Sequence, residues 1–201
     1  MQTADGVQTF VFFGIVGSGK GTQVKLLQDY LKQKDGKECV YIGTGEIFRQ
    51  IIASSANDET TRIAKEILNS GRLMPDEITN KIISEKIESE VFPDKHVIFD
   101  GYPRTVPQSE YFVNEMKSEQ RNGIKIVYIE VWKEEATKRN LLRGRHDDTA
   151  EGLAKRFDEY VNKVVPAMNY FKGKDGYKIC TVNGEQSVEA VHQEIIKVIN
   201  S

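Results

Sequence analysis

The stretch of the chain with the most specific chemistry runs from residue 9 to residue 22 and reads TFVFFGIVGSGKGT. A short apolar segment stops at Gly14, and the spacing from Gly14 to Lys20 is G-x-x-x-x-G-K. This spacing is typical of a loop between a buried strand and a helix, where backbone N–H groups surround a polyphosphate. The N-terminus of the helix adds positive potential, and Lys20 adds a mobile charge. The residues expected to contact the polyphosphate are Gly17, Ser18, Gly19, Lys20, Gly21 and Thr22.

One position departs from the common form of this loop. The usual pattern places Ser or Thr directly after the lysine, where the hydroxyl binds Mg²⁺. Here that position is Gly21, and the hydroxyl follows at Thr22. A nucleotide-dependent switch with such a loop also needs a guanine-reading N-K-x-D segment, which the sequence lacks. The ending GKGT therefore points away from GTPases and motor ATPases.

Three further stretches carry residues that suit a nucleotide phosphate. They read IGTGEIFR at 42–49, GRLMPDE at 71–77 and DGYPRTVPQ at 100–108. Asp100 follows a predicted buried strand, and open α/β sheets bind ligands at the carboxyl ends of their strands. We therefore expect the carboxylate of Asp100 to lie beside a phosphate-binding site at this edge of the sheet.

Each polar residue in these stretches also has a simpler interpretation. Arg49 and Arg104 would be surface arginines in weak ion pairs. Thr44 would be a helix cap, and Gln108 would be an exposed helix residue. The functional interpretation rests on their order and setting along the chain.

A third cluster is rich in arginine. Arg139 and Arg143 are four residues apart, so they share one face of a predicted helix. The simpler interpretation pairs Arg139 with Glu135 on the surface. A site that stabilises a transferring phosphoryl group needs several fixed positive charges. The cluster that would supply them comprises Arg139, Arg143, Arg145 and Arg156.

Short β-rich apolar runs alternate with helical patterns, and this alternation predicts a parallel sheet covered by helices on both faces. Pro166 is expected to kink one long helix, and Ser187 to cap the last one. The predicted strands are 9–13, 39–42, 96–99, 124–131 and 177–182, and the predicted helices are 20–34, 46–53, 60–69, 75–90, 107–121, 134–143, 149–171 and 187–199.

The length and composition of the chain limit the kinds of protein it can be. A chain of 201 residues suits one domain. The net charge of −2 argues against a general nucleic-acid-binding surface. Two cysteines, Cys39 and Cys180, are too few for a disulfide framework or a zinc site. We expect no zinc, no membrane span and a cytoplasmic location, since no signal peptide or long apolar run is present.

The loop, the three stretches and the arginine cluster together resemble the adenylate kinase family, in the family's order and over essentially the whole chain. The resemblance implies an α/β fold of the P-loop NTPase type, with three αβα layers and a five-stranded parallel sheet. It also implies a single domain, 1–201, whose core is 1–42, 74–138 and 150–201. A helical monophosphate-binding insertion would span 43–73, and a short lid 139–149.

The implied reaction is reversible phosphoryl transfer from ATP to AMP, which gives two ADP, in a monomer with no nucleic-acid or membrane partner. The catalytic residues would be Lys20, Arg104, Arg143, Arg145 and Arg156. Besides the loop, ATP would contact Arg139, Arg143 and Gln186. AMP would contact Thr44, Arg49, Arg72, Leu73, Met74, Gly101, Tyr102, Pro103, Arg104, Gln108, Arg145 and Arg156. Asp100 would hold Mg²⁺ through water.

The alternative within this class is a UMP/CMP kinase. In such relatives the positions of Thr44 and Gln108 are typically Ala and Asn, so the present residues favour AMP. Two features depart from the family pattern. Glu46 stands where the family has Asp, and Gly144 alone separates Arg143 from Arg145, where long-lid relatives carry an inserted domain. Closure is therefore expected to be a small swing of a loop.

Overall fold

Five parallel strands form the centre of the molecule in a computed structural model that describes residues 6–54, 59–70, 72–144 and 149–201. The strand order is β2-β3-β1-β4-β5. Thr9 of β1 is in register with Val97 of β3, and Phe10 with Lys125 of β4. The bounds are β1 Thr9–Phe13, β2 Cys39–Gly43, β3 His96–Asp100, β4 Ile124–Glu130 and β5 Tyr177–Asn183. Because the strands are parallel, the loops that follow them all lie at one edge of the sheet.

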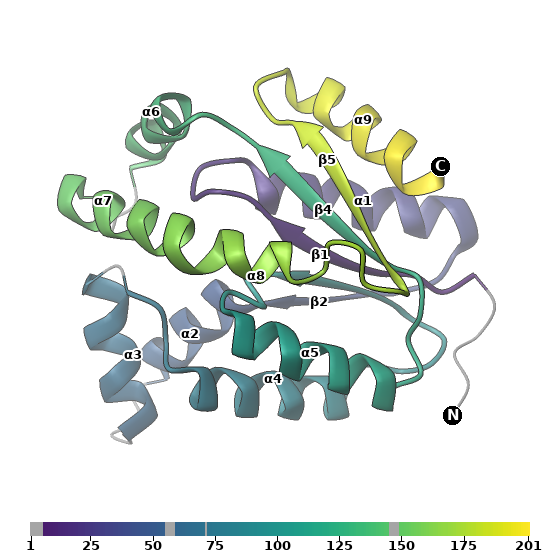
Figure 1. The fold of residues 1–201 in the computed structure, drawn as a ribbon, viewed down its shortest axis with the longest axis horizontal. Coiled ribbons are helices and arrows are strands. Elements are labelled where there is room, and N and C mark those ends of the chain that lie inside the picture. The colour runs from purple at the N-terminus through teal and green to yellow at the C-terminus, as the bar shows by residue number, and fades with distance from the viewer. Residues whose placement is uncertain (1–5, 55–58, 71, 145–148) are drawn as a thin grey trace.

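Helices cover both faces of this sheet (Figure 1). α1 (Lys20–Asp35) and α9 (Val188–Asn200) pack on one face, while α4 (Asp76–Glu90), α5 (Val106–Ser118) and α8 (Val165–Asn169) pack on the other. Successive residues of a strand point to opposite faces. Accordingly Phe10 and Phe12 join the core under α1 and α9, and Val11 and Phe13 join the other core. β1 is buried throughout, as expected for a central parallel strand.

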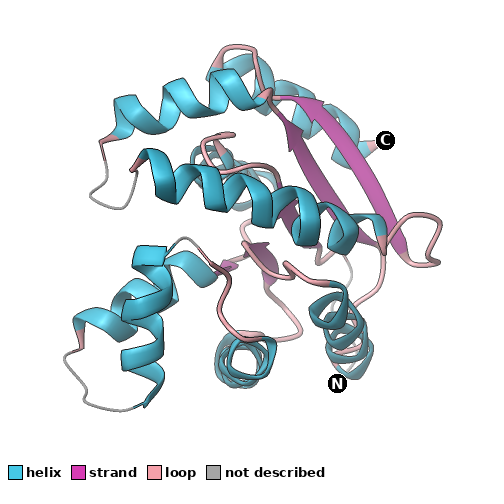
Figure 2. Cartoon of the chain, turned by 60° about the vertical axis from the view of Figure 1, so that its left-hand side comes forward, coloured by secondary structure: helices cyan, strands magenta, loops and turns pink. Residues whose placement is uncertain are grey.

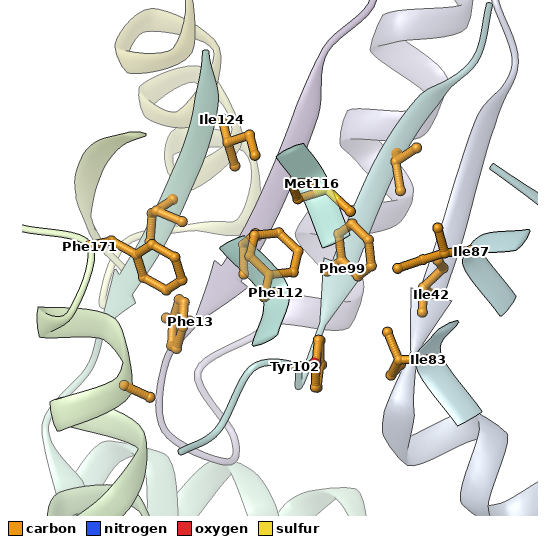
Figure 3. Packing of buried hydrophobic residues seen from close by; sticks show 14 of the residues in the cluster. Phe13, Ile42, Ile83, Ile87, Phe99, Tyr102, Phe112, Met116, Ile124 and Phe171 are labelled. Carbon is orange, nitrogen blue, oxygen red and sulfur yellow. The ribbon is translucent and has the colours of Figure 1, made fainter. Parts of the chain in front are cut away.

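Aromatic rings fill the core under α5 (Figure 3). Phe112 lies between Phe99 and Phe171, with ring centroids 5.0 Å and 6.0 Å away. Both contacts are edge-on, which is a favourable geometry for aromatic pairs. These rings anchor α5 directly behind the loop that leaves β3, so they hold that loop in place.

Two short helices, α2 (Thr44–Ala53) and α3 (Glu59–Ser70), lie together at one end of the molecule (Figure 2). They correspond to the helical pair expected between the second strand and the long helix that follows it. α6 (Lys133–Arg143) and α7 (Ala150–Glu159) complete the order of elements. Among the described residues, no helix combines the length and the apolar character that a membrane crossing needs.

The sequence predictions of the five strands agree with the structure within one residue at each end. The predicted helix 149–171 is divided instead into α7, a π-helical turn at Tyr160–Val164, and α8. Pro166 has no N–H with which to continue the α-helical hydrogen bonds, and the N–H of Val165 reaches back to the carbonyl of Tyr160. The helix predicted to end at residue 121 ends at Ser118, because Gln120 adopts a positive φ of 53°.

Candidate active site

A cavity of about 1240 Å³ lies at the carboxyl edge of the sheet. Its walls come from the β1–α1 loop, from α2 and α3, from the turn after β3, and from α6, α7 and the β5–α9 turn. Segments from both halves of the chain therefore meet in one space. Such a cavity, formed mainly by loops at the ends of parallel strands, is the usual place for a ligand in this class of fold.

The β1–α1 loop brings backbone N–H groups to this cavity. α1 begins after Gly19, and no side chain caps its first N–H groups. The N–H of Thr22 bonds to the carbonyl of Gly19, and the N-terminal end of the helix dipole favours an anion in front of it. Gly17 has φ of +87°, and a Cβ there would lie 2.5 Å from Nδ2 of Asn140. A side chain at this position would push the loop away from α6.

Lys20 lies among this loop's own carbonyl groups. Its ammonium donates to the carbonyl of Gly14 at 2.8 Å and to that of Ile15 at 3.1 Å. Burial lowers the pKa of Lys20 from 10.5 to about 8; Asp100 raises it, and Arg104 and Arg143 lower it. The lysine therefore lies near a carboxylate and two arginines that come from distant parts of the sequence.

Arg104 and Gln108 lie on the opposite wall, after β3. Nε of Arg104 donates to the carbonyl of Gly101 at 2.7 Å, and the backbone N–H of Arg104 donates to Oε1 of Gln108 at 2.8 Å. Burial lowers the pKa of Arg104; Asp100 opposes this effect, and Arg156 and Arg49 add to it. Three arginines thus approach one another in the cavity, and an anionic ligand would relieve their repulsion.

Asp100, the last residue of β3, is held by Tyr41 of the neighbouring strand. The phenol of Tyr41 donates to Oδ2 of Asp100 at 3.3 Å. The ring of Tyr41 passes over Gly43, where a Cβ would overlap it. Burial raises the pKa of Tyr41, and the nearby Asp100 raises it further. Tyr41 therefore stays protonated and acts as a donor that fixes the orientation of the carboxylate.

α6 supplies the third wall. Nε of Arg139 donates to Glu135 at 2.8 Å, and Nη1 donates to the carbonyl of Gly184 at 2.9 Å. The local ion pair and the contact with the cavity thus coexist, because one guanidinium serves both. Arg143 donates to Oδ1 of Asn140 at 2.7 Å. Asn140 is fully buried and donates to the carbonyl of Val16 at 2.9 Å, so it joins α6 to the β1–α1 loop.

Comparison with known proteins agrees with this geometry. The family model described as adenylate kinase matches residues 12–176. The chain belongs to the adenylate kinase family. It is 33% identical to an adenylate kinase of Oenococcus oeni over 195 residues, which are 96% of this chain and 98% of that protein. It is 31% identical to adenylate kinase 1 of a Nostoc species, over 95% of this chain and 98% of that one. It is 33% identical to an adenylate kinase of Parabacteroides distasonis, over 95% and 97%.

Most of the residues that the family resemblance singled out line the cavity. On the side of the β1–α1 loop and α6 they are Gly17, Ser18, Gly19, Lys20, Gly21, Thr22, Arg139, Arg143 and Gln186. On the side of α2 and β3 they are Thr44, Arg49, Arg72, Leu73, Met74, Asp100, Gly101, Pro103, Arg104 and Gln108, with Arg156 from α7. The side chain of Gln108 is buried, with 2% of its surface exposed, so the alternative that it is a solvent-exposed helix residue is wrong.

The side chain of Tyr102, one of the predicted residues, does not line the cavity. The side chain of Tyr102 points into the core (Figure 3), where it is 1% exposed and donates to Oδ1 of Asn80 at 2.8 Å. Gly101 and Pro103 line the cavity while the ring between them faces inward, so the contact of Tyr102 with AMP, which stays a prediction, would be made by its backbone. Arg145 lies outside the described residues, as do the neighbouring residues 146–148 of the expected lid.

Sequence reasoning missed three residues that position the site. Tyr41 orients Asp100, Asn140 orients Arg143, and Asp76 accepts from Nε2 of Gln108 at 2.8 Å. Asp76 lies in the GRLMPDE stretch, but the sequence alone does not show that Gln108 is its partner. Asn140 carried a usable signal, since a polar residue between two arginines on the inner side of a helix needs buried partners.

Proposed function

We propose that this chain is an adenylate kinase in the enzymatic sense, which transfers the terminal phosphoryl group of ATP to AMP and forms two ADP. The observation that carries the proposal is that one cavity has two unlike anion-binding walls on opposite sides. One wall is a polyphosphate loop, and the other holds arginines beside a buried amide. A protein that only bound or hydrolysed a triphosphate would have no use for the second wall.

In this proposal the polyphosphate of ATP binds the β1–α1 loop, and the phosphate of AMP binds Arg104 and Arg49. Lys20 lies between the two, as its interaction with both Asp100 and Arg104 supports. Arg143 and Arg156 would neutralise charge on the transferring group, and Arg145 is assigned the same role by resemblance. Catalysis is then positioning and charge stabilisation, with no covalent intermediate on the protein.

The residues present fit a magnesium ion that is held mainly by nucleotide phosphates and water. Asp100 lines the cavity with a carboxylate whose orientation Tyr41 fixes. Within the described ranges, no group of three His, Cys, Asp or Glu side chains forms a protein cage. Mg²⁺ usually keeps several waters and needs few protein ligands. When bound, the ion would neutralise phosphate charge, and Asp100 would orient one of its waters.

We further propose that α2 and α3, within residues 43–73, and the short segment 139–149 close over the substrates. Residues of α2 and α3 line the cavity, as do Arg139 and Arg143, and closure would exclude water from the reacting phosphates. The cytoplasmic location and the monomeric state stay predictions of the resemblance.

The experiment is a panel of monophosphates at fixed Mg-ATP. We expect ADP formation with AMP to exceed formation of the diphosphates of UMP, CMP and GMP, and we expect the Lys20→Ala variant to lose most of the activity. A preference for UMP or CMP would favour the pyrimidine kinase instead. Slow hydrolysis of ATP that is independent of any monophosphate would overturn the proposal in favour of a nucleotide-dependent switch.

A further inference from the structure

The side-chain amide of Gln108 is held at both of its ends. Its oxygen accepts from the backbone N–H of Arg104 at 2.8 Å, and its nitrogen donates to Oδ1 of Asp76 at 2.8 Å. A carboxylate can only accept hydrogen bonds, and a backbone N–H can only donate them. Rotation of the amide by half a turn would set oxygen against oxygen and N–H against N–H. The amide therefore has one orientation.

Asp76 is itself fixed in place. Its second oxygen accepts from the hydroxyl of Thr105 at 2.9 Å. That hydroxyl oxygen in turn accepts the backbone N–H of Gln108 at 3.2 Å and caps α5. The single hydrogen of Thr105 is thus directed at Asp76. Asp76 comes from the start of α4 and Thr105 from the start of α5, so the network joins two helices beneath the cavity wall.

The hydrogen-bonding groups that this wall offers to a ligand have fixed donor and acceptor positions. Gln108 lines the cavity and keeps one N–H and one oxygen lone pair that the network does not use. Thr44 lines the same cavity, and its hydroxyl donates its only hydrogen to the carbonyl of Gly101 at 2.8 Å. Toward a ligand, Thr44 can therefore only accept.

This polarity distinguishes two classes of purine. A 6-aminopurine offers an amino donor beside ring-nitrogen acceptors, whereas a 6-oxopurine offers a carbonyl acceptor beside a protonated ring nitrogen. The two edges are reversed in donor and acceptor order. A freely rotating glutamine amide would serve either base by turning over. The amide of Gln108, held between Asp76 and the N–H of Arg104, serves one order only.

We propose that Asp76 is a positioning residue for base specificity, which prevents the rotation of Gln108 that a 6-oxopurine monophosphate would require. The proposal rests on the proposed function, since it takes the base of the monophosphate to lie against Gln108. Asp76 is not among the residues that line the cavity. Its effect is transmitted through the amide.

The test compares AMP with IMP as phosphoryl acceptors in the wild type, in Asp76→Asn and in Glu77→Gln. Asparagine at position 76 has a rotatable amide, so it can face either end of Gln108. We expect the ratio of kcat/KM for AMP to that for IMP to fall about tenfold in Asp76→Asn, the effect of one buried hydrogen-bond mismatch. Glu77→Gln removes the same charge from the same helical turn at an exposed residue, and we expect it to leave the ratio unchanged.

The ratio of kcat/KM for AMP to that for IMP distinguishes misfolding, a purely structural role of Asp76 and failure of the proposed function. Both substrates are assayed on one preparation, so a loss of folded protein cancels. Equal loss with AMP and IMP in Asp76→Asn would mean a structural role and overturn the inference, as would a wild type that accepts IMP as well as AMP. If the wild type phosphorylated no AMP, the proposed function itself would fail. Should Asp76→Asn not fold, Asp76→Ser, which also lacks the carboxylate, is expected to lower the ratio in the same way.

Discussion

Binding of ATP should become weaker as the pH rises from 7 to 9, because Lys20 loses its proton in this range in the free protein. Burial lowers the pKa of this lysine to about 8. A bound polyphosphate would place anionic oxygens around the ammonium and raise its pKa again. The protonated form is thus the one that binds, and binding above pH 8 requires the uptake of a proton.

The size of the effect follows from the pKa. With a free pKa of about 8, the neutral fraction of free Lys20 rises from about 0.1 at pH 7 to about 0.9 at pH 9, while bound polyphosphate would keep the lysine protonated. The apparent affinity should therefore fall about tenfold between these two pH values, and proton uptake should rise from about 0.1 to about 0.9 per site.

Isothermal titration calorimetry with a non-hydrolysable ATP analogue measures both quantities. Titrations at pH 7, 8 and 9 in two buffers of different ionisation enthalpy give the number of protons taken up. The Lys20→Arg variant is the control, because a guanidinium stays charged over this range. Its affinity should not change with pH in this way. Proton uptake near zero at pH 9 in the wild type, or equal uptake in both proteins, would refute the reasoning.

Three further predictions concern single substitutions. Tyr41→Phe removes the donor that fixes Asp100, and steady-state assays should show kcat reduced about tenfold with little change in KM for AMP; an unchanged kcat would contradict this role. Gly17→Ala places a Cβ against Asn140, so we expect a lower melting temperature in thermal unfolding and weaker ATP binding in a binding assay. An ATP affinity equal to that of the wild type would contradict this, because the loop would then accommodate the Cβ without a change in its binding geometry. Arg104→Ala should raise KM for AMP about a hundredfold while KM for ATP changes little, and unchanged dependence on AMP would remove Arg104 from the site.

The layers of the fold could be predicted from the sequence because each strand is marked by a short apolar or β-branched run between turn residues. The apolar run of β1 and the β-branched run of β4 stand between clear turn signals, and both were located within one residue. The end of α5 was less predictable. Arg121 lies outside the helix, where its side chain is 5% exposed and donates to the carbonyls of Lys95 and Phe92. These partners belong to another part of the chain, so a local pattern does not reveal them.

The same distinction applies to the site. Asp100 ends β3, Arg104 lies in the turn after it, and Lys20 begins the helix that follows β1. A parallel sheet brings the segments after its strands to one edge, so these residues could be expected to lie near one another. The contacts of Tyr41 with Asp100 and of Asp76 with Gln108 depend on which strands and helices are neighbours and on side-chain conformation. Those partners are fixed only by tertiary packing, which no local pattern contains.

The strand order has a consequence for how the protein is made. β1 leaves the ribosome before β3 and β4, yet these two strands are its neighbours in the sheet, since Thr9 is in register with Val97 and Phe10 with Lys125. During synthesis the phosphate-binding loop is therefore present long before the strands that support it. Its surroundings are completed by contacts between residues distant in sequence, which form slowly. The part of the chain with the clearest chemical signature is thus synthesised before both strands that flank it, and its neighbours in the sheet are complete only once β4 has been made.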